Sequence, residues 1–476
     1  MARIVLIEAA HPLDEIAPPI SLGYLASFLE KKYGGLDIII TRSTKGQIPV
    51  DLSSEDIVGI TAFSQHYNFA LELAKNIKEH NQSVPVIMGG PHISPLPETM
   101  SEHMDVSVLF EGEETFSDLV EHLLNGFIDK SKLRDIPGLA FYEGDKLVRT
   151  EARGFTKELD TLPPPARHLM DIVPGGRLDM LTARGCPYKC IFCSSPALWE
   201  GIRYHSLDYV AEEIDFVMEK YKPTRIGFLD DLFVIHKKRF KAILAYMQKQ
   251  GYHHDVSISF LARTDLLDES VCQAIKDWDC EVSFGFESGS DRVLSQLKGG
   301  KLSTSASINA INLLQKYDIK QVGTFILGFP GETMEDMEAT YDFIFDNNIT
   351  TGAVSVCSPL PGTSLWDDAI EKGLVSLDMD WGKLRFNEKH SLEGKILLND
   401  SVSVKELEFM FRKINNYLQY LLVKNFSVKD LLVITRMDIP YFLRTLFSNP
   451  RKIARFAKHM IRAKVLDSED GHTPKG

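Results

Sequence analysis

The 476-residue sequence has few cysteines, fewer cationic than anionic side chains and no long apolar run. Its 53 Lys and Arg face 66 Asp and Glu, and the net charge of −13 argues against a protein that coats nucleic acid. Because no uncharged apolar run reaches about 18 residues, we expect no ordinary membrane-spanning helix. The first apolar stretch, residues 4–7, is too short for a signal peptide and predicts a strand.

Cysteine is scarce, and three of the six cysteines fall between positions 186 and 193. Such crowding does not suit a disulfide framework, which distributes its cysteines along a small secreted domain. It indicates a metal site in a reducing compartment, so we expect a cytoplasmic protein. The length predicts about three domains.

Residues 1–135 alternate between apolar runs and amphipathic stretches, which predicts an N-terminal Rossmann-like, doubly wound parallel sheet covered on both faces. The predicted strands are 4–7, 38–40, 57–61, 84–88 and 106–110, and the predicted helices are 22–32, 68–79 and 115–124. Ligands of such folds lie beyond the carboxyl ends of the strands. There the sequence places Pro18-Pro19, Gly89-Gly90-Pro91-His92 and Glu111-Gly112-Glu113-Glu114. Each of these, taken singly, is equally typical of an ordinary turn.

Residues 136–171 are predicted to form a linker, because 161–165 is too proline-rich for regular structure. Residues 172–390 show a second series of apolar runs that alternate with amphipathic stretches. This series predicts a partial (β/α)6 barrel with its chemistry at the carboxyl ends of the strands. The predicted strands are 178–183, 225–229, 256–261, 281–286, 321–327 and 353–357. The predicted helices are 208–220, 237–249, 269–278, 303–317 and 334–347.

Residues 391–476 are predicted to be a helical C-terminal region. Within it, residues 441–464 carry seven Lys or Arg and no Asp or Glu, and their apolar residues recur at helical spacing. A basic amphipathic helix of this kind can lie on an anionic membrane surface. It can equally dock on the acidic body of its own chain.

The most specific pattern is the segment Arg184-Gly185-Cys186-Pro187-Tyr188-Lys189-Cys190-Ile191-Phe192-Cys193. Its C-x3-C-x2-C spacing supplies three thiolates from one loop, and thiolates are the ligands of iron–sulfur clusters. Three cysteines leave one iron of a [4Fe-4S] cluster free to bind another molecule. Structural zinc requires four closed ligands, usually in two pairs, and no partner pair follows the triplet.

This triplet, after the first strand of a six-fold β/α series, resembles the radical S-adenosylmethionine (SAM) superfamily. The resemblance implies that Cys186, Cys190 and Cys193 hold the cluster. It implies that the open iron binds the amino and carboxylate groups of SAM, and that one electron cleaves SAM to a 5′-deoxyadenosyl radical.

The resemblance also implies contacts to SAM. Phe192 would pack beside the adenine, and the turn containing Gly328 and Gly331 would lie against the adenosyl group. Arg263, Glu287 and Ser288 would contact the carboxylate or the ribose, although Glu287 is also typical of a helix start. Asp230 and Asp231 are either a contact at the barrel mouth or a solvated pair.

The N-terminal half resembles the subgroup of these enzymes that carries a cobalamin-binding domain. The matching segments are Pro18–Leu25, Gly59–Thr61, Gly89–His92 and Glu111–Glu114. The resemblance implies cobalamin contacts from Pro19, Ser64, Gly89, Gly90, His92, Glu111 and Gly112. Small residues suit such a site because a corrin ring needs close approach to the backbone.

One departure concerns cobalt. The D-x-H-x-x-G pattern, whose His ligates cobalt in many cobalamin proteins, is absent, and His11 and His66 lack its Asp. Many members of the subgroup lack it too. The lower axial ligand of the cobalt could therefore be water, another side chain or none. An alternative is that the domain has lost cobalamin.

The resemblance predicts a cobalamin-dependent radical SAM enzyme that methylates an unactivated carbon or phosphorus centre. A second hypothesis is a radical cyclase, rearrangement or C–C bond-forming enzyme without methyl transfer. Methylthio transfer to RNA is disfavoured, because no cysteine precedes Cys186. The non-enzymatic alternative is a cobalamin-binding sensor or carrier. The expected partners are a small-molecule or lipid-like substrate and an electron donor of flavodoxin or ferredoxin type, without nucleic acid, and the basic tail suggests peripheral membrane contact.

Overall fold

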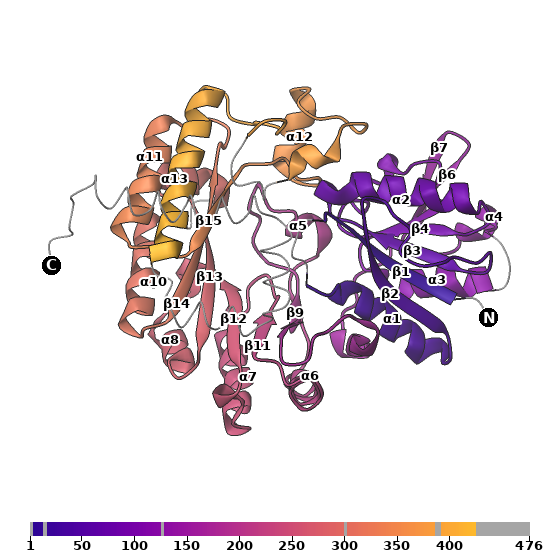
Figure 1. The fold of residues 1–476 in the computed structure, drawn as a ribbon, viewed down its shortest axis with the longest axis horizontal. Helices are drawn as coiled ribbons and strands as arrows, with labels where there is room; N and C mark the ends of the chain where they lie inside the picture. The colour runs from indigo at the N-terminus through magenta and orange to yellow at the C-terminus, as the bar shows by residue number, and fades with distance from the viewer. Residues whose placement is uncertain (1–2, 13–16, 125–127, 299–301, 386–391, 425–476) are drawn as a thin grey trace, which may run out of the picture.

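The computed structural model describes residues 3–12, 17–124, 128–298, 302–385 and 392–424 (Figure 1). Two open sheets, each covered by helices, lie side by side, and the last described helix packs on the outer side of the second sheet. The predicted basic helix at 441–464 lies outside the described residues. No helix within those ranges is long and apolar enough to cross a membrane.

The N-terminal sheet has seven strands in the order β2-β1-β3-β4-β5-β6-β7. Its five parallel strands are β1 (Arg3–Ala10), β2 (Asp37–Thr44), β3 (Ile57–Thr61), β4 (Val86–Gly89) and β5 (Val106–Val108). Alternate residues of β1 enter different cores, because successive side chains of a strand point to opposite faces. Leu6 packs with α1 (Ile20–Tyr33) and α3 (Gly112–Leu124), whereas Ile7 packs with α2 (Tyr67–His80). The predicted doubly wound sheet is confirmed.

Residues that the sequence assigned to the linker extend this sheet. β6 (Leu139–Glu143) and β7 (Lys146–Arg149) form a hairpin, and β6 pairs antiparallel with β5. Between the strands, Gly144 takes a φ of 59° in the turn. Strands of four and five residues beside proline-rich chain give too short an alternation to be recognised from sequence.

The second sheet has six parallel strands in the order β15-β14-β13-β12-β11-β8, an open barrel as predicted. The strands are β8 (Arg177–Met180), β11 (Arg225–Phe228), β12 (Ser257–Ala262), β13 (Cys280–Glu287), β14 (Lys320–Leu327) and β15 (Gly352–Val356). The intervening helices are α6 (Leu207–Lys220), α7 (Lys237–Lys249), α8 (Glu269–Ile275), α9 (Asp291–Lys298), α10 (Thr304–Lys316) and α11 (Met334–Asp346). Side-chain caps at Ser206, Asp268, Ser303 and Thr333 begin four of them, because each oxygen accepts an otherwise unpaired N–H of the first turn.

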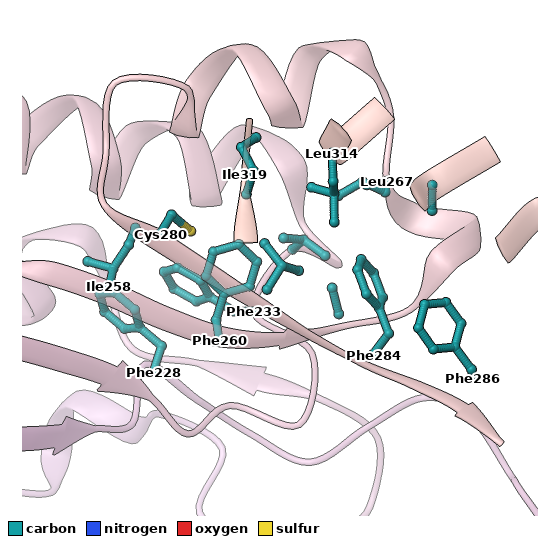
Figure 2. Packing of buried hydrophobic residues seen from close by; sticks show 14 of the residues in the cluster. Phe228, Phe233, Ile258, Phe260, Leu267, Cys280, Phe284, Phe286, Leu314 and Ile319 are labelled. Carbon is teal, nitrogen blue, oxygen red and sulfur yellow. The ribbon is translucent and has the colours of Figure 1, made fainter. Parts of the chain in front are cut away.

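Aromatic side chains fill the space between these strands and their helices (Figure 2). Phe228 stacks on Phe233 with ring centroids 4.1 Å apart, and Phe260 lies 5.5 Å from Phe233. Because these residues face the helices, the alternate residues of each strand face the inside of the barrel. That interior is where a substrate would lie.

After β15 the chain returns to the N-terminal domain. α12 (Ser364–Glu371) lies near α2 in Figure 1, and Trp381 packs with its ring centroid 4.4 Å from that of His92. The side-chain amide of Asn68 on α2 donates to the carboxylate of Asp380 at 2.5 Å, and its oxygen accepts the backbone N–H of Trp381. The chain then reaches α13 (Val404–Lys424), which packs on α11 and β15. A segment that follows both sheets thus packs on the N-terminal domain and helps to hold the two sheets together.

Candidate active site

The three clustered cysteines lie on the loop that leaves the first barrel strand. After β8, the short strand β9 (Ala183–Arg184) pairs antiparallel with β10 (Arg203–Tyr204), so the loop between them is held at both ends. Gly185 has a φ of 88°, and a Cβ there would lie 2.2 Å from the carbonyl oxygen of Gly201. Only glycine fits at this position, directly before Cys186.

All three thiols are free and half-buried. Burial raises the pKa of Cys186 and Cys190, and it raises the pKa of Cys193 to about 11. The thiols are therefore protonated at neutral pH until a positively charged group binds them, since the thiolate is the metal ligand. Within the described ranges, no three His, Cys, Asp or Glu side chains converge on a point that could hold one ion. The donor set fits a cubane cluster, in which each cysteine binds its own iron.

Several residues predicted to contact SAM surround this loop. The ring of Phe192 lies 6.0 Å from that of Phe329, centroid to centroid. Arg263 is buried and lies over Tyr188 of the cysteine loop, 3.6 Å from the ring centroid. Its guanidinium also bonds the carboxylate of Asp265 at 3.0 and 3.1 Å. Arg263 thus already has an anionic partner and an aromatic one beside the cluster loop.

Glu287 ends β13 at an irregularity in the strand. The register shifts between Gly285 and Glu287, and Glu287 has a φ of 65°, which is rare for a residue with a side chain. Its carboxylate lies 3.1 Å from the ammonium of Lys298, and both side chains are buried. Both charges act on the thiol of Cys190, so the pair lies near the cluster loop, and strained residues and bulges commonly occur at such sites.

Ser288, by contrast, is engaged away from the mouth. Its hydroxyl lies 3.2 Å from that of Thr340 on α11 and accepts the Ser290 N–H. The side chain is buried, so this geometry favours a structural role, and cofactor contact by Ser288 stays a prediction.

The turn after β14 is tightly braced. Gly328 and Gly331 both have positive φ, as the predicted tight turn requires. The carboxylate of Glu332 accepts the N–H of Gly328 at 2.5 Å and of Phe329 at 3.1 Å. From the other side, Gly331 donates its N–H to Asp400. These hydrogen bonds fix the turn, and its Phe329 packs near Phe192 of the cysteine loop.

A cavity of about 380 Å³ opens between the two sheets. From the N-terminal domain it is lined by Leu6, Gly59, Thr61, Phe63, Gly89, Gly90, Phe110, Glu111, Gly112 and Phe116. From the barrel it is lined by Leu181, Arg184, Gly185, Trp199, Leu229 and Asp231. The lining is mostly apolar and lies at the carboxyl ends of parallel strands, where this fold binds ligands.

The N-terminal wall fits a large flat cofactor. Gly90 has a φ of 98°, and a Cβ there would lie 2.2 Å from Thr61 Oγ1. At Gly59 a Cβ would lie 3.0 Å from Leu6 and 3.4 Å from Phe116. Because Thr61, Leu6 and Phe116 themselves line the cavity, a side chain at either glycine would displace residues of this wall. Of the predicted cobalamin contacts, Gly89, Gly90, Glu111 and Gly112 line this cavity.

The other three predicted cobalamin contacts are not in the lining. Pro19 begins α1, and its carbonyl accepts the N–H of Leu22. His92 is fully buried, with Nδ1 3.0 Å from Ser64 Oγ and Nε2 3.2 Å from Thr99 Oγ1. Burial lowers the pKa of His92 to about 3, so the ring is neutral. With both ring nitrogens occupied, the geometry favours a structural role for His92 and Ser64.

The paired carboxylates after β11 have different surroundings. Asp230 is buried and accepts from both the N–H and the hydroxyl of Thr182, and burial raises its pKa to about 6. Asp231 bonds Ser195 Oγ at 2.6 Å and lines the cavity. Only Asp231 can reach a ligand there.

Two arginines that the sequence analysis did not select as site residues, Arg184 and Arg203, join the two walls through Glu111, which it did select. Arg184 bonds Glu111 at 2.9 Å and Glu113 at 2.6 Å, and Arg203 bonds Glu111 at 2.9 Å. The partners are separated by 71–92 residues, so no local pattern could reveal them. The only feature of the sequence that could have pointed to these ion pairs is the position of Arg184 directly before Gly185-Cys186.

Comparison with known proteins agrees with both halves of the site. Residues 180–344 match the Radical SAM superfamily, and residues 10–120 match the B12 binding domain. An uncharacterized methyltransferase of Pyrococcus horikoshii is 36% identical over 384 residues, which cover 77% of this chain and 81% of the relative. The bacteriochlorophyllide d C-12(1)-methyltransferase of Chlorobaculum tepidum is 26% identical over 412 residues, covering 82% of each chain.

A further relative is named as a cyclase. The anaerobic magnesium-protoporphyrin IX monomethyl ester cyclase of Rubrivivax gelatinosus is 26% identical over 431 residues, 86% of this chain and 74% of the relative. Among solved structures, the radical SAM methyltransferase TsrM of Kitasatospora setae, with cobalamin and a [4Fe-4S] cluster bound, superposes with a TM-score of 0.63. That match has 18% identity and covers 86% of this chain and 81% of TsrM, and it shows a shared fold.

Proposed function

The chain belongs to the radical SAM superfamily and carries its cobalamin-binding domain, and we propose that it is a methyltransferase acting on an unactivated carbon or phosphorus centre of a small molecule. When bound, the cluster supplies one electron to SAM and cobalamin carries a methyl group. The protein binds both cofactors, excludes water and holds the substrate between them.

The observation that carries this proposal is the shared cavity. Gly89 and Gly90 of the cobalamin-binding domain line the same space as Arg184 and Gly185, which directly precede the first cluster cysteine. A ligand that fills the cavity therefore reaches from the N-terminal sheet to the cluster loop. Methyl transfer requires this juxtaposition, because the methyl carrier and the site of hydrogen abstraction must face one substrate.

We assign the cofactors as follows. Cys186, Cys190 and Cys193 would hold the cluster, and Phe192, Arg263, Glu287 and the Gly328–Gly331 turn would surround SAM. Gly89, Gly90, Glu111 and Gly112 would hold cobalamin in the cavity. We propose that residues 1–135, extended by the β6–β7 hairpin, form the cobalamin domain and that residues 172–390 form the radical core, with the rest of 136–171 connecting them.

The barrel interior supports an uncharged reacting group on the substrate. Leu229 follows β11 and is 42% exposed, and Leu261 on the neighbouring β12 is 47% exposed. Because the neighbouring Phe228 and Phe260 face the helices, these two leucines face the inside of the barrel. Two cations beside the cluster loop are already paired, Arg263 with Asp265 and Lys298 with Glu287. An apolar substrate surface would cover these leucines.

The experiment that tests the function is mass spectrometry of the products from SAM. Anaerobically reconstituted protein is incubated with a low-potential reductant, in place of the flavodoxin or ferredoxin that we expect as donor, with and without cobalamin. We expect 5′-deoxyadenosine together with S-adenosylhomocysteine, the latter only when cobalamin is present. 5′-Deoxyadenosine alone would favour a cyclase or another radical enzyme, the chemistry named in the Rubrivivax relative. If neither product forms, the hypothesis that remains is a cobalamin-binding carrier.

The basic segment 441–464 suggests a lipid-like substrate reached by an otherwise cytoplasmic enzyme at an anionic membrane surface. Flotation with vesicles containing anionic lipid, using the full chain and a chain that ends at residue 440, tests this. Greater flotation of the full chain would support the hypothesis, and equal recovery of both in the supernatant would refute it.

A further inference from the structure

Arg184 lies between the two proposed cofactor sites. It ends β9, and a single residue separates it from Cys186. That residue, Gly185, is packed against the Gly201 carbonyl and the Trp199 side chain. Because the connecting backbone has so little freedom, a displacement of Arg184 must move Cys186 with it.

The partners of Arg184 come from the cobalamin-binding domain. Its Nη1 donates to Glu111 and its Nη2 to Glu113, at the start of α3. Glu111 is itself held by Arg203 and by the Thr156 N–H at 2.7 Å. Arg184, Glu111 and Glu113 are all buried. A forked guanidinium that bonds two carboxylates fixes direction as well as distance.

The ion-pair group of Arg184, Glu111 and Glu113 lines the cavity as well as joining the two domains. Arg184, Gly185, Glu111 and Glu113 all line the cavity. Other contacts already join the two halves: a Cβ on Gly362, which follows β15, would lie 2.7 Å from Ala197 and 3.3 Å from Pro95. The molecule therefore does not depend on Arg184 alone to hold its domains together. A ligand in the cavity, however, lies against the residue that sets the position of Cys186.

We propose that Arg184 is a positioning residue that couples occupancy of the cobalamin cavity to the placement of the cluster loop. Cobalamin in the cavity would cover Arg184, Glu111 and Glu113 and so keep this ion-pair group closed, and Gly185 would transmit the restraint to Cys186. The coupling makes SAM cleavage productive only when the methyl carrier is in place. This inference rests on the proposed function for the identity of the two ligands.

The test uses the double variant Arg184→Met/Glu113→Gln in the full chain. Removing both charges leaves no unpaired buried charge at Glu113, while Glu111 keeps Arg203 and Thr156. The matched control is Arg153→Met. Arg153 also pairs with α3, at Glu114 and Asp118, but it does not line the cavity.

Two measurements decide the outcome. In the anaerobic assay with cobalamin, we expect the ratio of S-adenosylhomocysteine to 5′-deoxyadenosine to fall about tenfold or more in the double variant, because small misplacements of reacting groups have effects of this size. Hydrogen–deuterium exchange of residues 185–198 should slow when hydroxocobalamin is added to wild-type protein, and not in the double variant. The Arg153→Met protein should match wild type in both.

An unchanged product ratio, or equal slowing of exchange in wild type and the double variant, would overturn the proposal. A loss of iron that accounts for the lost products would also overturn it, since Arg184 would then only stabilise the loop. If wild-type protein makes no S-adenosylhomocysteine, the proposed function fails. The exchange measurement would still decide the coupling in that case.

Discussion

The side-chain amide of Asn399 donates hydrogen bonds to the backbone carbonyls of Phe329 and Glu332, at 2.7 and 2.8 Å. Its amide oxygen accepts the N–H groups of Ser401 and Val402. Asn399 therefore ties the chain before α13 to the turn that we place against SAM. A residue beyond the barrel sheet sets the geometry of a loop inside it.

Replacing Asn399 by Asp should loosen this turn. The variant loses both donated hydrogen bonds, at a cost of about 1–3 kcal/mol in the free energy of unfolding. It should also raise the KM for SAM in the 5′-deoxyadenosine assay. Asn347→Ala is the control, because Asn347 bonds the Phe343 carbonyl at 2.8 Å at the opposite end of α11. A KM rise in both variants would refute a specific role for Asn399.

Single replacement of Cys186, Cys190 or Cys193 by Ala should abolish 5′-deoxyadenosine formation. A reconstituted wild-type chain should hold about four irons, and each variant should hold fewer. Cys272→Ala is the control, because Cys272 is fully buried in the barrel core, and we expect it to lose only about 1 kcal/mol of stability. Full SAM cleavage by any member of the triplet would disprove the cluster assignment.

Gly90→Ala should destabilise the protein and weaken cobalamin binding. A Cβ at φ 98° would clash with Thr61 Oγ1, and the strain costs about 1–3 kcal/mol. At the adjacent Gly89 a Cβ would meet only the Val108 carbonyl at 3.7 Å, so Gly89→Ala should unfold close to wild type. Urea unfolding and cobalamin titration by absorbance measure the two effects. Equal unfolding midpoints for the two variants would contradict the prediction.

His92 should make the protein less stable in acid. Burial lowers its pKa from 6.5 to about 3, so the unfolded chain binds a proton that the folded chain does not. The free energy of unfolding then falls as pH drops below 6.5, by about 1.4 kcal/mol per pH unit from this group. His92→Gln should remove that slope in urea titrations between pH 6.5 and 5. An identical slope in wild type and variant would rule out the contribution.

Glu332, in contrast to His92, should make the protein less stable as the pH rises. Burial raises its pKa from 4.5 to about 7, so the folded chain holds a proton that the unfolded chain has released. Its contribution to stability is present below pH 4.5 and is lost as pH rises to about 7. Glu332→Gln should therefore gain stability relative to wild type as pH increases across this range. A constant difference between the two proteins would contradict the assigned pKa.

The periodicity of the sequence determined most of the architecture. Buried strands of a parallel sheet must be apolar along their length, and their covering helices must be amphipathic, so each element leaves a local pattern. The predicted strand at 57–61 and helix at 237–249 have the same bounds in the structure. The cysteine spacing likewise needs no partner elsewhere, because one loop supplies all three thiols.

Tertiary structure alone decided which polar side chains line the cavity and which bond within the protein. Ser288 and His92 belong to segments typical of the family, yet both are buried and bonded within the protein, whereas Arg184 and Asp231 line the cavity. Likewise, the hairpin of β6 and β7 joins the N-terminal sheet by pairing with β5. These outcomes depend on partners far apart in the chain, such as Arg184 and Glu111, 73 residues apart, which no local pattern records. A local sequence specifies the face that a segment buries, but only the folded chain specifies what that face meets.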